Sequence, residues 1–274
     1  MPCYNEQDNE KLFYDEAVKA FGQLHISYEL IFINDGSADN TLNVLHELCA
    51  SQHGTDIRVL SFSRNFGKEA AIYAGLKACK GDYAVLIDAD MQQPPSTACE
   101  MFEIIRNNPE YDCVTAYQEQ RSEGKVLSLF KKAFYKLINA VADTPFVSGA
   151  SDFRLMSRKV VDAILSVTEY HRFSKGIFSW VGFNTFYMPY KALERANGKS
   201  TWSFFKLVKY AIEGIVGYTT APLKLSMFVG MGSAFSSLIY ALVVIIKRLA
   251  FGVDVPGYAS IVVLLLLLGG LQLF

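Results

Sequence analysis

The sequence predicts an α/β protein whose mainly parallel sheet carries helices on both faces and is followed by a membrane-inserted C-terminal segment. Three observations support this fold class. Apolar strand-like runs alternate with helical stretches between residues 28 and 117, which is the pattern of a mainly parallel sheet. One of these runs ends in an Asp-x-Asp sequence, Asp88 to Asp90. Two long uncharged stretches lie near the C-terminus.

Composition and charge narrow the class further. The hydrophobic fraction of 51% and the mean hydropathy of +0.19 are high for a soluble enzyme. Residues 1–120 carry 8 Lys and Arg against 19 Asp and Glu, whereas residues 121–210 carry 15 against 6. A basic segment before an apolar tail suits an anionic membrane surface or a phosphate-bearing substrate, although an ordinary solvated face has the same composition. The five cysteines are scattered, so neither a disulfide framework nor a zinc site is expected.

The N-terminal elements are predicted in order. Pro2 to Glu6 is expected to be a turn into an acidic helix, with no strand before it, so we expect the first strand of the sheet to be missing. A buried strand over 28–33 ends in the turn Asn34-Asp35-Gly36-Ser37, and a helix follows to about Ser51. A strand over 58–63, the loop Arg64-Asn65-Phe66-Gly67-Lys68 and a helix over 69–79 come next.

The central prediction concerns the strand that begins at Tyr83. It is a short apolar run without alternation, as in a strand buried on both faces. Residues i and i+2 of an extended chain point to one side, so Asp88, Asp90 and then Gln92 share a face. Carboxylate oxygens at this spacing suit Mg²⁺ or Mn²⁺ bound together with phosphate oxygens. For an isolated motif, a solvated acidic turn is the competing interpretation.

The alternation ends after a helix over 97–107 and a strand over 112–117. We then expect a basic amphipathic helix over 125–141, a helix over 158–167, and an aromatic strand or loop over 177–190. The stretch 202–218 is predicted to be an interfacial amphipathic helix. Leu225–Ile246 is long enough to span a bilayer, and Tyr258–Phe274 is predicted to be a second, truncated span of a membrane hairpin.

These pieces suggest a nucleotide site. Asp35 and Glu6 could accept hydrogen bonds from a ribose and base, while a metal at Asp88 and Asp90 would neutralise a diphosphate. Two basic loops could complete the phosphate cradle, one containing Arg64 and Lys68 and the other Arg195 and Lys199. Each residue alone is more simply a solvated surface group.

Six motifs, in order, resemble a known family. They are Pro2-x-Tyr4-Asn5-Glu6, Asn34-Asp35-Gly36-Ser37, Arg64-Asn65-Phe66-Gly67-Lys68, Asp88-Ala89-Asp90-Met91-Gln92, Asp152-Phe153-Arg154-Leu155 and Arg195-x-x-Gly198-Lys199-Ser200. The chain resembles family 2 glycosyltransferases of GT-A fold, in the polyisoprenyl-phosphate group that includes bactoprenol glucosyltransferases and dolichol-phosphate mannose synthases. The resemblance covers nearly the whole chain. It implies a metal-dependent, inverting hexosyltransferase with a catalytic domain over 1–200, interfacial helices over 201–224 and membrane helices over 225–274.

The resemblance also implies ligands and roles. The donor would be a nucleotide sugar, and UDP-glucose is the first expectation. The acceptor would be a polyprenyl phosphate such as undecaprenyl phosphate, and the cofactor would be Mg²⁺ or Mn²⁺. The implied nucleotide-binding residues are Pro2, Tyr4, Glu6, Asp35, Lys68, Asp88, Arg195 and Lys199. Asp88, Asp90 and Gln92 would hold the metal, and the implied catalytic residues are Asp152, Asp90 and Arg154.

The sequence departs from the family pattern at several positions. Asn34 replaces a frequent aspartate, Gln93 replaces an acid, and Gln118 stands where an arginine for the acceptor phosphate is expected. Arg121, Lys131 and Lys132 would then share that role.

Asp152 occupies the position of a base proposed for the family. A phosphate monoester has a second pKa of about 6 and hardly needs deprotonation, so Asp152 is alternatively expected to orient a basic neighbour such as Arg154.

Two other functions remain open. One is a different membrane family 2 transferase, although the Gln-x-x-Arg-Trp pattern of processive synthases is missing from the sequence. The other is a membrane-tethered nucleotide-sugar binder without catalysis. The resemblance places the protein in the inner membrane as a multi-pass protein with a cytoplasmic catalytic domain. A homo-oligomer is a further expectation, and no nucleic-acid partner is expected.

Overall fold

A computed structural model describes residues 1–51, 56–118, 150–169, 172–193, 220–251 and 257–273. The chain divides into two compact units. The first comprises Met1–Asn139 and Thr144–Gly214, and the second comprises Ala140–Asp143 and Ile215–Phe274. The predicted helices over 125–141 and 202–218 and the loop over 195–200 lie outside the described residues.

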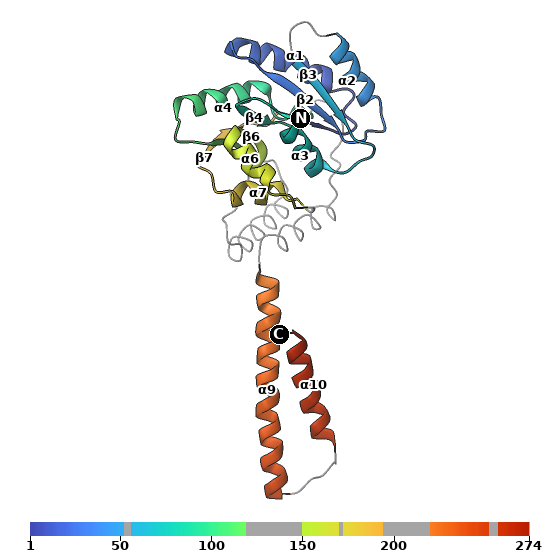
Figure 1. Cartoon of the computed structure of the whole chain (residues 1–274), viewed down its shortest axis with the longest axis vertical. Helices are drawn as coiled ribbons and strands as arrows, with labels where there is room; N and C mark the ends of the chain where they lie inside the picture. Colours follow the sequence, from blue (N-terminus) through green and yellow to red (C-terminus); the bar gives the residue numbers. More distant parts are fainter. Residues whose placement is uncertain (52–55, 119–149, 170–171, 194–219, 252–256, 274) are drawn as a thin grey trace. The chain divides into compact units, whose positions relative to one another are not determined.

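The first unit alternates strands and helices, as predicted (Figure 1). Its elements in chain order are β1 (Pro2–Cys3), α1 (Glu10–Phe21), the 3₁₀ helix η1 (Gly22–Leu24), β2 (Glu29–Asn34), α2 (Thr41–Ala50), β3 (Asp56–Ser61), α3 (Lys68–Ala78), β4 (Tyr83–Leu86), α4 (Pro95–Asn107), β5 (Cys113–Gln118), β6 (Ala150–Ser157), α6 (Arg158–Ser166), α7 (Ser174–Trp180) and β7 (Thr185–Tyr190).

The strands form two sheets, ordered β1-β2-β3 and β4-β6-β5-β7. All pairs are parallel except those that β6 makes with β4 and β5. β6 was not predicted from the sequence, because it follows a region where the alternation of strands and helices has ended. The segment predicted as strand or loop over 177–190 instead begins inside α7 and reaches β7 after a turn.

The expectation that no strand precedes the first helix is wrong. Pro2 and Cys3 pair in parallel with Ile33 and Asn34. The N–H of Ile33 donates to the Met1 carbonyl at 2.9 Å, and the N–H of Asp35 donates to the Cys3 carbonyl at 2.9 Å. Pro2 has no N–H to donate, but the ladder here uses the carbonyls on either side of it, so proline is tolerated at this position.

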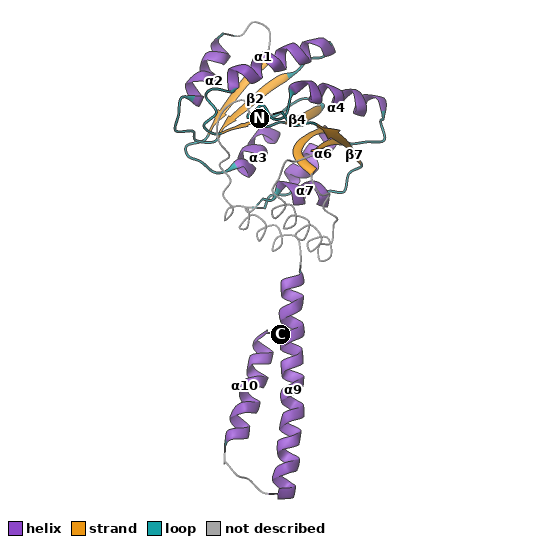
Figure 2. Ribbon diagram, turned by 180° about the vertical axis from the view of Figure 1, so that it is seen from behind, coloured by secondary structure: helices purple, strands orange, loops and turns teal. Residues whose placement is uncertain are grey.

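Helices cover both sides of the sheets (Figures 1 and 2). The side chains of β2 contact helices on both sides. Leu30 and Phe32 belong to a core cluster with apolar residues of α1, α2 and α4. Ile33, next along the strand, points the other way and lies against Gly75 of α3. This alternation is the period of two expected of a strand covered on both faces.

The second unit is a helical hairpin of α9 (Ala221–Phe251) and α10 (Tyr258–Leu273), seen side by side in Figure 1. Small residues let the helices approach closely: a Cβ on Gly270 would lie 2.8 Å from the Gly230 carbonyl oxygen. By length and composition, one candidate span is found among the described residues, Leu223–Lys247, with a mean hydropathy of 2.1. The apolar stretch Ser260–Gln272 is shorter, so the predicted second span falls below the length of about 20 residues that a bilayer requires.

Candidate active site

The loops after β1 and β2 are fastened to each other by hydrogen bonds. We call residues 4–7, 34–41 and 64–67 the β2 corner. The N–H of Asn5 donates to Ser37 Oγ at 3.0 Å, and Asn5 Oδ1 accepts the N–H of Ala38 at 2.9 Å. The N–H of Glu6 donates to Thr41 Oγ1 at 2.9 Å. Asn5 has a φ of 56°, a conformation that asparagine tolerates better than most residues. Tyr4 and Glu6 are therefore presented from a fixed backbone.

Asp35 anchors the third segment of the β2 corner. It is 3% exposed, and its two carboxylate oxygens accept the N–H groups of Phe66 and Gly67 at 2.7 and 2.9 Å. Next to it, Gly36 has a φ of 62°, and a Cβ there would lie 2.2 Å from the carbonyl carbon of Arg64. The sequence analysis expected Asp35 to accept hydrogen bonds from a nucleoside. In this structure its carboxylate shapes the loop that leads into α3.

Lys68, the first residue of α3, connects two carboxylates that are 64 residues apart in the sequence. Its Nζ lies 2.8 Å from Asp88 Oδ1 and 2.8 Å from Asp152 Oδ2. We call these three residues the lysine bridge. Their side chains are 34%, 27% and 17% exposed, in the order Lys68, Asp88, Asp152, so the bridge remains accessible to a ligand.

The pKa values of the lysine bridge follow from two opposed effects. Burial lowers the pKa of Lys68, but the carboxylates of Asp152 and Asp88 raise it by more, and the net pKa lies above its ordinary value. Burial raises the pKa of Asp152, but the charges of Lys68 and Lys175 outweigh it and hold that pKa well below its usual range. Asp152 is therefore ionised at neutral pH.

Gln93 holds Asp88 from the other side. Its side-chain oxygen accepts the backbone N–H of Asp88 at 2.8 Å, and its Nε2 donates to Asp88 Oδ2 at 3.0 Å. Gln93 is 6% exposed. The departure from a family acid noted in the sequence therefore lies directly behind Asp88, where a neutral amide can donate and a carboxylate could not.

The Asp-x-Asp turn continues through Asp90 to Gln92. The N–H of Gln92 donates to Asp90 Oδ1 at 3.2 Å, and Met91 between them has a φ of 60°. The Gln92 carbonyl accepts the N–H of Leu193 at 3.2 Å. The first bond stabilises the turn, and the second connects the turn to the segment after β7.

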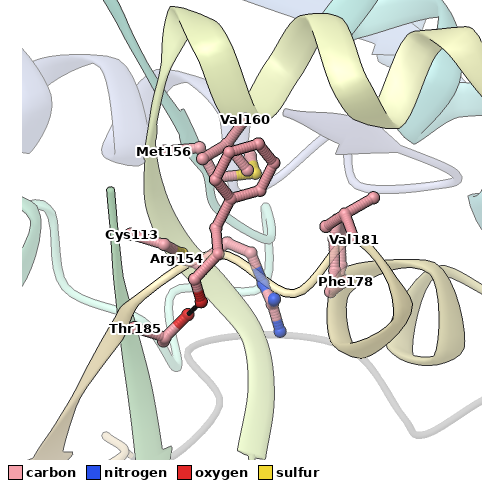
Figure 3. A pocket seen from close by; sticks show the side chains of 8 residues that line it. Cys113, Arg154, Met156, Val160, Phe178, Val181 and Thr185 are labelled. Carbon is pink, nitrogen blue, oxygen red and sulfur yellow. Dashed lines mark hydrogen bonds between the residues drawn. The ribbon is translucent and has the colours of Figure 1, made fainter. Parts of the chain in front are cut away.

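Arg154 does not pair with the carboxylate of Asp152, as the sequence analysis suggested; Asp152 holds Lys68 instead. Arg154 is 6% exposed, donates from Nη2 to the Ser151 carbonyl at 3.0 Å, and stacks over the ring of Phe178 at 3.6 Å. Figure 3 shows it among Cys113, Thr185, Phe178 and Val181. The cavity beside it measures 10 Å³, about the space of one water molecule. Arg154 is therefore a buried residue that links β6 to Phe178 of α7, behind the lysine bridge.

Three further residues near the lysine bridge were missed by the sequence analysis. Glu69 follows Lys68 in α3, and its Oε2 accepts the N–H of Ser174 at 2.9 Å and the hydroxyl of the same serine. This contact fixes the first turn of α7, which carries Lys175. No local pattern in the sequence shows that Glu69 of α3 binds the first residue of α7.

The remaining predicted site residues lie outside the described part of the chain. They are Arg121, Lys131, Lys132, Arg195 and Lys199. Pro2 lies in β1, and Tyr4 is 39% exposed at the β2 corner.

The donor set at the end of β4 fits a hard divalent cation. Asp88 and Asp90 offer carboxylate oxygens at one sheet edge, and such oxygens are the ligands that Mg²⁺ and Mn²⁺ prefer. Among the described residues, no group of three or more His, Cys, Asp or Glu side chains gathers as a metal site. A metal here would complete its coordination with phosphate oxygens and water, as Mg²⁺ commonly does.

Parallel strand pairs in both sheets and an acidic turn after β4 fit the class of nucleotide-sugar transferases of GT-A type. The chain belongs to glycosyl transferase family 2, whose model matches residues 1–165, and it is a glycosyltransferase. A bactoprenol glucosyl transferase of Shigella phage SfV is 38% identical over 275 residues, covering 100% of this chain and 88% of that protein. A prophage bactoprenol glucosyl transferase homolog of Escherichia coli (strain K12) is 37% identical over 276 residues, covering 100% and 88%.

Solved structures agree on the fold. Glucosyl-3-phosphoglycerate synthase from Mycobacterium tuberculosis, in complex with Mn²⁺, uridine diphosphate and phosphoglyceric acid, superposes with a TM-score of 0.53. It is 16% identical and covers 78% of this chain and 74% of that chain. Mannosyl-3-phosphoglycerate synthase from Rubrobacter xylanophilus gives 0.51 at 18% identity, covering 77% and 69%.

Proposed function

We propose that the protein transfers glucose from UDP-glucose to the phosphate of a membrane polyprenyl phosphate such as undecaprenyl phosphate, with inversion at the sugar. The observation that carries the proposal is the full-length similarity to bactoprenol glucosyl transferases at about 38% identity. The candidate span Leu223–Lys247 is consistent with a lipid acceptor.

The chemistry follows from the charges involved. An oxygen of the acceptor phosphate forms a bond to the sugar C1, while the bond from C1 to the donor diphosphate breaks and its electron pair leaves with the nucleoside diphosphate. The phosphate is largely dianionic at neutral pH, so the harder task is to stabilise the leaving diphosphate. A bound Mg²⁺ or Mn²⁺ would supply Lewis-acid stabilisation. Asp88 and Asp90 would hold it, as would Gln92.

Other roles extend the proposal. The β2 corner would bind the nucleoside through Pro2, Tyr4 and Glu6, and Asp35 would hold the loop at residues 64–67 in place for it. Arg195 and Lys199 would close on the donor phosphates, and Arg121, Lys131 and Lys132 would contact the acceptor. The catalytic domain would lie on the cytoplasmic side of the inner membrane, with a membrane anchor that includes Leu223–Lys247 and with assembly into a homo-oligomer. The Mn²⁺ and uridine diphosphate named for the neighbouring synthase support a UDP-sugar and a divalent metal here.

The test is transfer of radiolabelled sugar from a panel of UDP- and GDP-sugars to undecaprenyl phosphate in detergent. We expect metal-dependent label in the lipid from UDP-glucose, abolished by EDTA. Asp90→Ala should reduce turnover by about 10³-fold, the scale of losing a main electrostatic stabiliser. Asp15→Ala, at an exposed position of α1, is the matched control.

The donor panel separates the alternatives. Label from another sugar alone would keep the reaction type and correct the donor. Nucleotide binding without label in any lipid would refute the transferase reaction with this acceptor and favour a binding protein.

A further inference from the structure

Asp152 lies among basic side chains, and the proposed transfer reaction gives these side chains no role. Lys68 contacts its Oδ2 at 2.8 Å, and Lys175 is close enough to contribute to its electrostatics. Its Oδ1 is buried and has no hydrogen-bond partner among the described residues. A carboxylate placed to take a proton would need a substrate hydroxyl, and a phosphate acceptor has none to lose at neutral pH.

We propose that Asp152 is a positioning residue that gathers Lys68 and Lys175 into a binding site for the acceptor's phosphate, in which Lys175 is a direct ligand. This inference rests on the proposed function. It replaces a proton-transfer role for Asp152 with an electrostatic one, and it assigns a residue, Lys175, that the family motifs in this sequence did not indicate.

The charge balance supports the site. Without ligands, Lys68 is shared between Asp88 and Asp152. A divalent cation bound at Asp88 would take over that carboxylate and leave Lys68 to Asp152. Lys68, Lys175 and Asp152 then carry a net charge of +1, with the Arg154 guanidinium buried behind them. A phosphate dianion complements this charge, and lysine is well suited to bind it as a point charge.

The fold also connects the two lysines. Lys68 and Glu69 are consecutive in the first turn of α3, and Glu69 accepts both the N–H and the hydroxyl of Ser174. Ser174 immediately precedes Lys175. The first turn of α3 therefore carries Lys68 itself. Through the contact between Glu69 and Ser174, the same turn also fixes the start of α7, which carries Lys175. Because both are fixed by one element, the distance between them is largely set before a ligand binds, which lowers the entropic cost of binding.

The test measures KM for undecaprenyl phosphate and for UDP-glucose separately. Lys175→Gln should raise the acceptor KM about tenfold, the scale of one charge-assisted hydrogen bond, while the donor KM changes less than about twofold. Lys175→Arg should recover most of the acceptor affinity. Lys77→Gln, at an exposed position of α3, controls for the loss of any lysine. A merely structural role would lower the folded fraction and leave both KM values unchanged.

Asp152→Asn completes the test, because it keeps the size of the side chain and removes its charge. A positioning role predicts a raised acceptor KM together with a partial loss of kcat. An unchanged acceptor KM in Lys175→Gln, or a complete loss of kcat with unchanged acceptor KM in Asp152→Asn, would overturn the inference while wild-type transfer persists. Absence of transfer by the wild-type protein would instead refute the proposed function.

Discussion

The β2 corner and the lysine bridge both centre on a carboxylate at the end of a strand, yet the two carboxylates are used differently. Asp35 is buried, and both of its oxygens accept backbone N–H groups. Asp88 is partly exposed and pairs with the ammonium of Lys68 and the amide of Gln93. Backbone donors cannot leave, whereas a lysine side chain can turn to another partner. The corner is therefore a fixed frame, and the bridge can exchange its partners for ligands.

Gly36→Ala should have the largest effect on stability, because Gly36 lies where the backbones of residues 34–41 and 64–67 of the β2 corner contact each other. Its Cβ would lie 2.2 Å from the Arg64 carbonyl carbon, and φ is positive. Clash and strain together should cost about 2–4 kcal/mol, seen as a fall of several degrees in Tm by circular dichroism in detergent. Gly22→Ala is the control, since nothing lies within 4 Å of the added Cβ. Equal Tm values for the two variants would show that the corner is not rigid.

The comparison is sharpest for one substitution made at both carboxylates. Asp35→Asn leaves a backbone N–H without its acceptor and should cost about 1–3 kcal/mol of stability. Asp88→Asn should change Tm little, because partly exposed ion pairs contribute about 0–1 kcal/mol, but should reduce sugar transfer strongly. Thermal unfolding and label transfer are measured on both variants, to show which carboxylate contributes to stability and which to activity. The reverse assignment of effects would contradict the division into frame and exchangeable site.

Gln93→Glu tests the support behind Asp88. The substitution removes the Nε2 donor and places a second negative charge 3.0 Å from Asp88 Oδ2. We expect kcat/KM to fall about tenfold, the scale of one hydrogen bond to a charged group. Gln23→Glu, at an exposed position of η1, adds the same charge elsewhere. If kcat/KM were the same in both variants, the Gln93 amide would have no part in orienting Asp88.

Glu10→Gln should have an effect on stability with a defined pH dependence. Glu10 is 0% exposed, neither carboxyl oxygen has a partner among the described residues, and burial raises its pKa to about 8. The native state thus holds this proton at a pH where the unfolded chain has lost it, so the Glu10 contribution to stability falls as pH rises from about 4.5 to about 8. Tm of Glu10→Gln relative to wild type should therefore be higher at pH 8 than at pH 5. A difference that does not change with pH would mean that Glu10 does not titrate in this range.

Much of the fold was predictable because its signals are local. The apolar strands over residues 28–117 and the turn at Asn34 depend on near neighbours, and they appear within about two residues of where they were expected. The extended conformation expected from Asp88 to Gln92 was wrong, because β4 ends at Leu86 and the chain turns there, with Met91 at a φ of 60°. The short strand at Pro2 and the antiparallel β6 were missed, because their pairing involves partners far away in the sequence. The second apolar helix was also predictable from its run of uncharged residues: the stretch expected over Tyr258–Phe274 is α10, Tyr258–Leu273.

The sequence alone determined the chemical inventory: an Asp-x-Asp turn, a glycine that tolerates positive φ, a set of basic loops and an apolar tail. These follow from residue type and spacing of a few positions. The tertiary structure decided which charges meet. The motifs single out Lys68 and Asp152, but nothing in the sequence indicates that these two residues lie side by side, because they are 84 positions apart. Only the packing of α3 and α7 against the strands brings these charges together, and their energies depend on distance and burial rather than on sequence order.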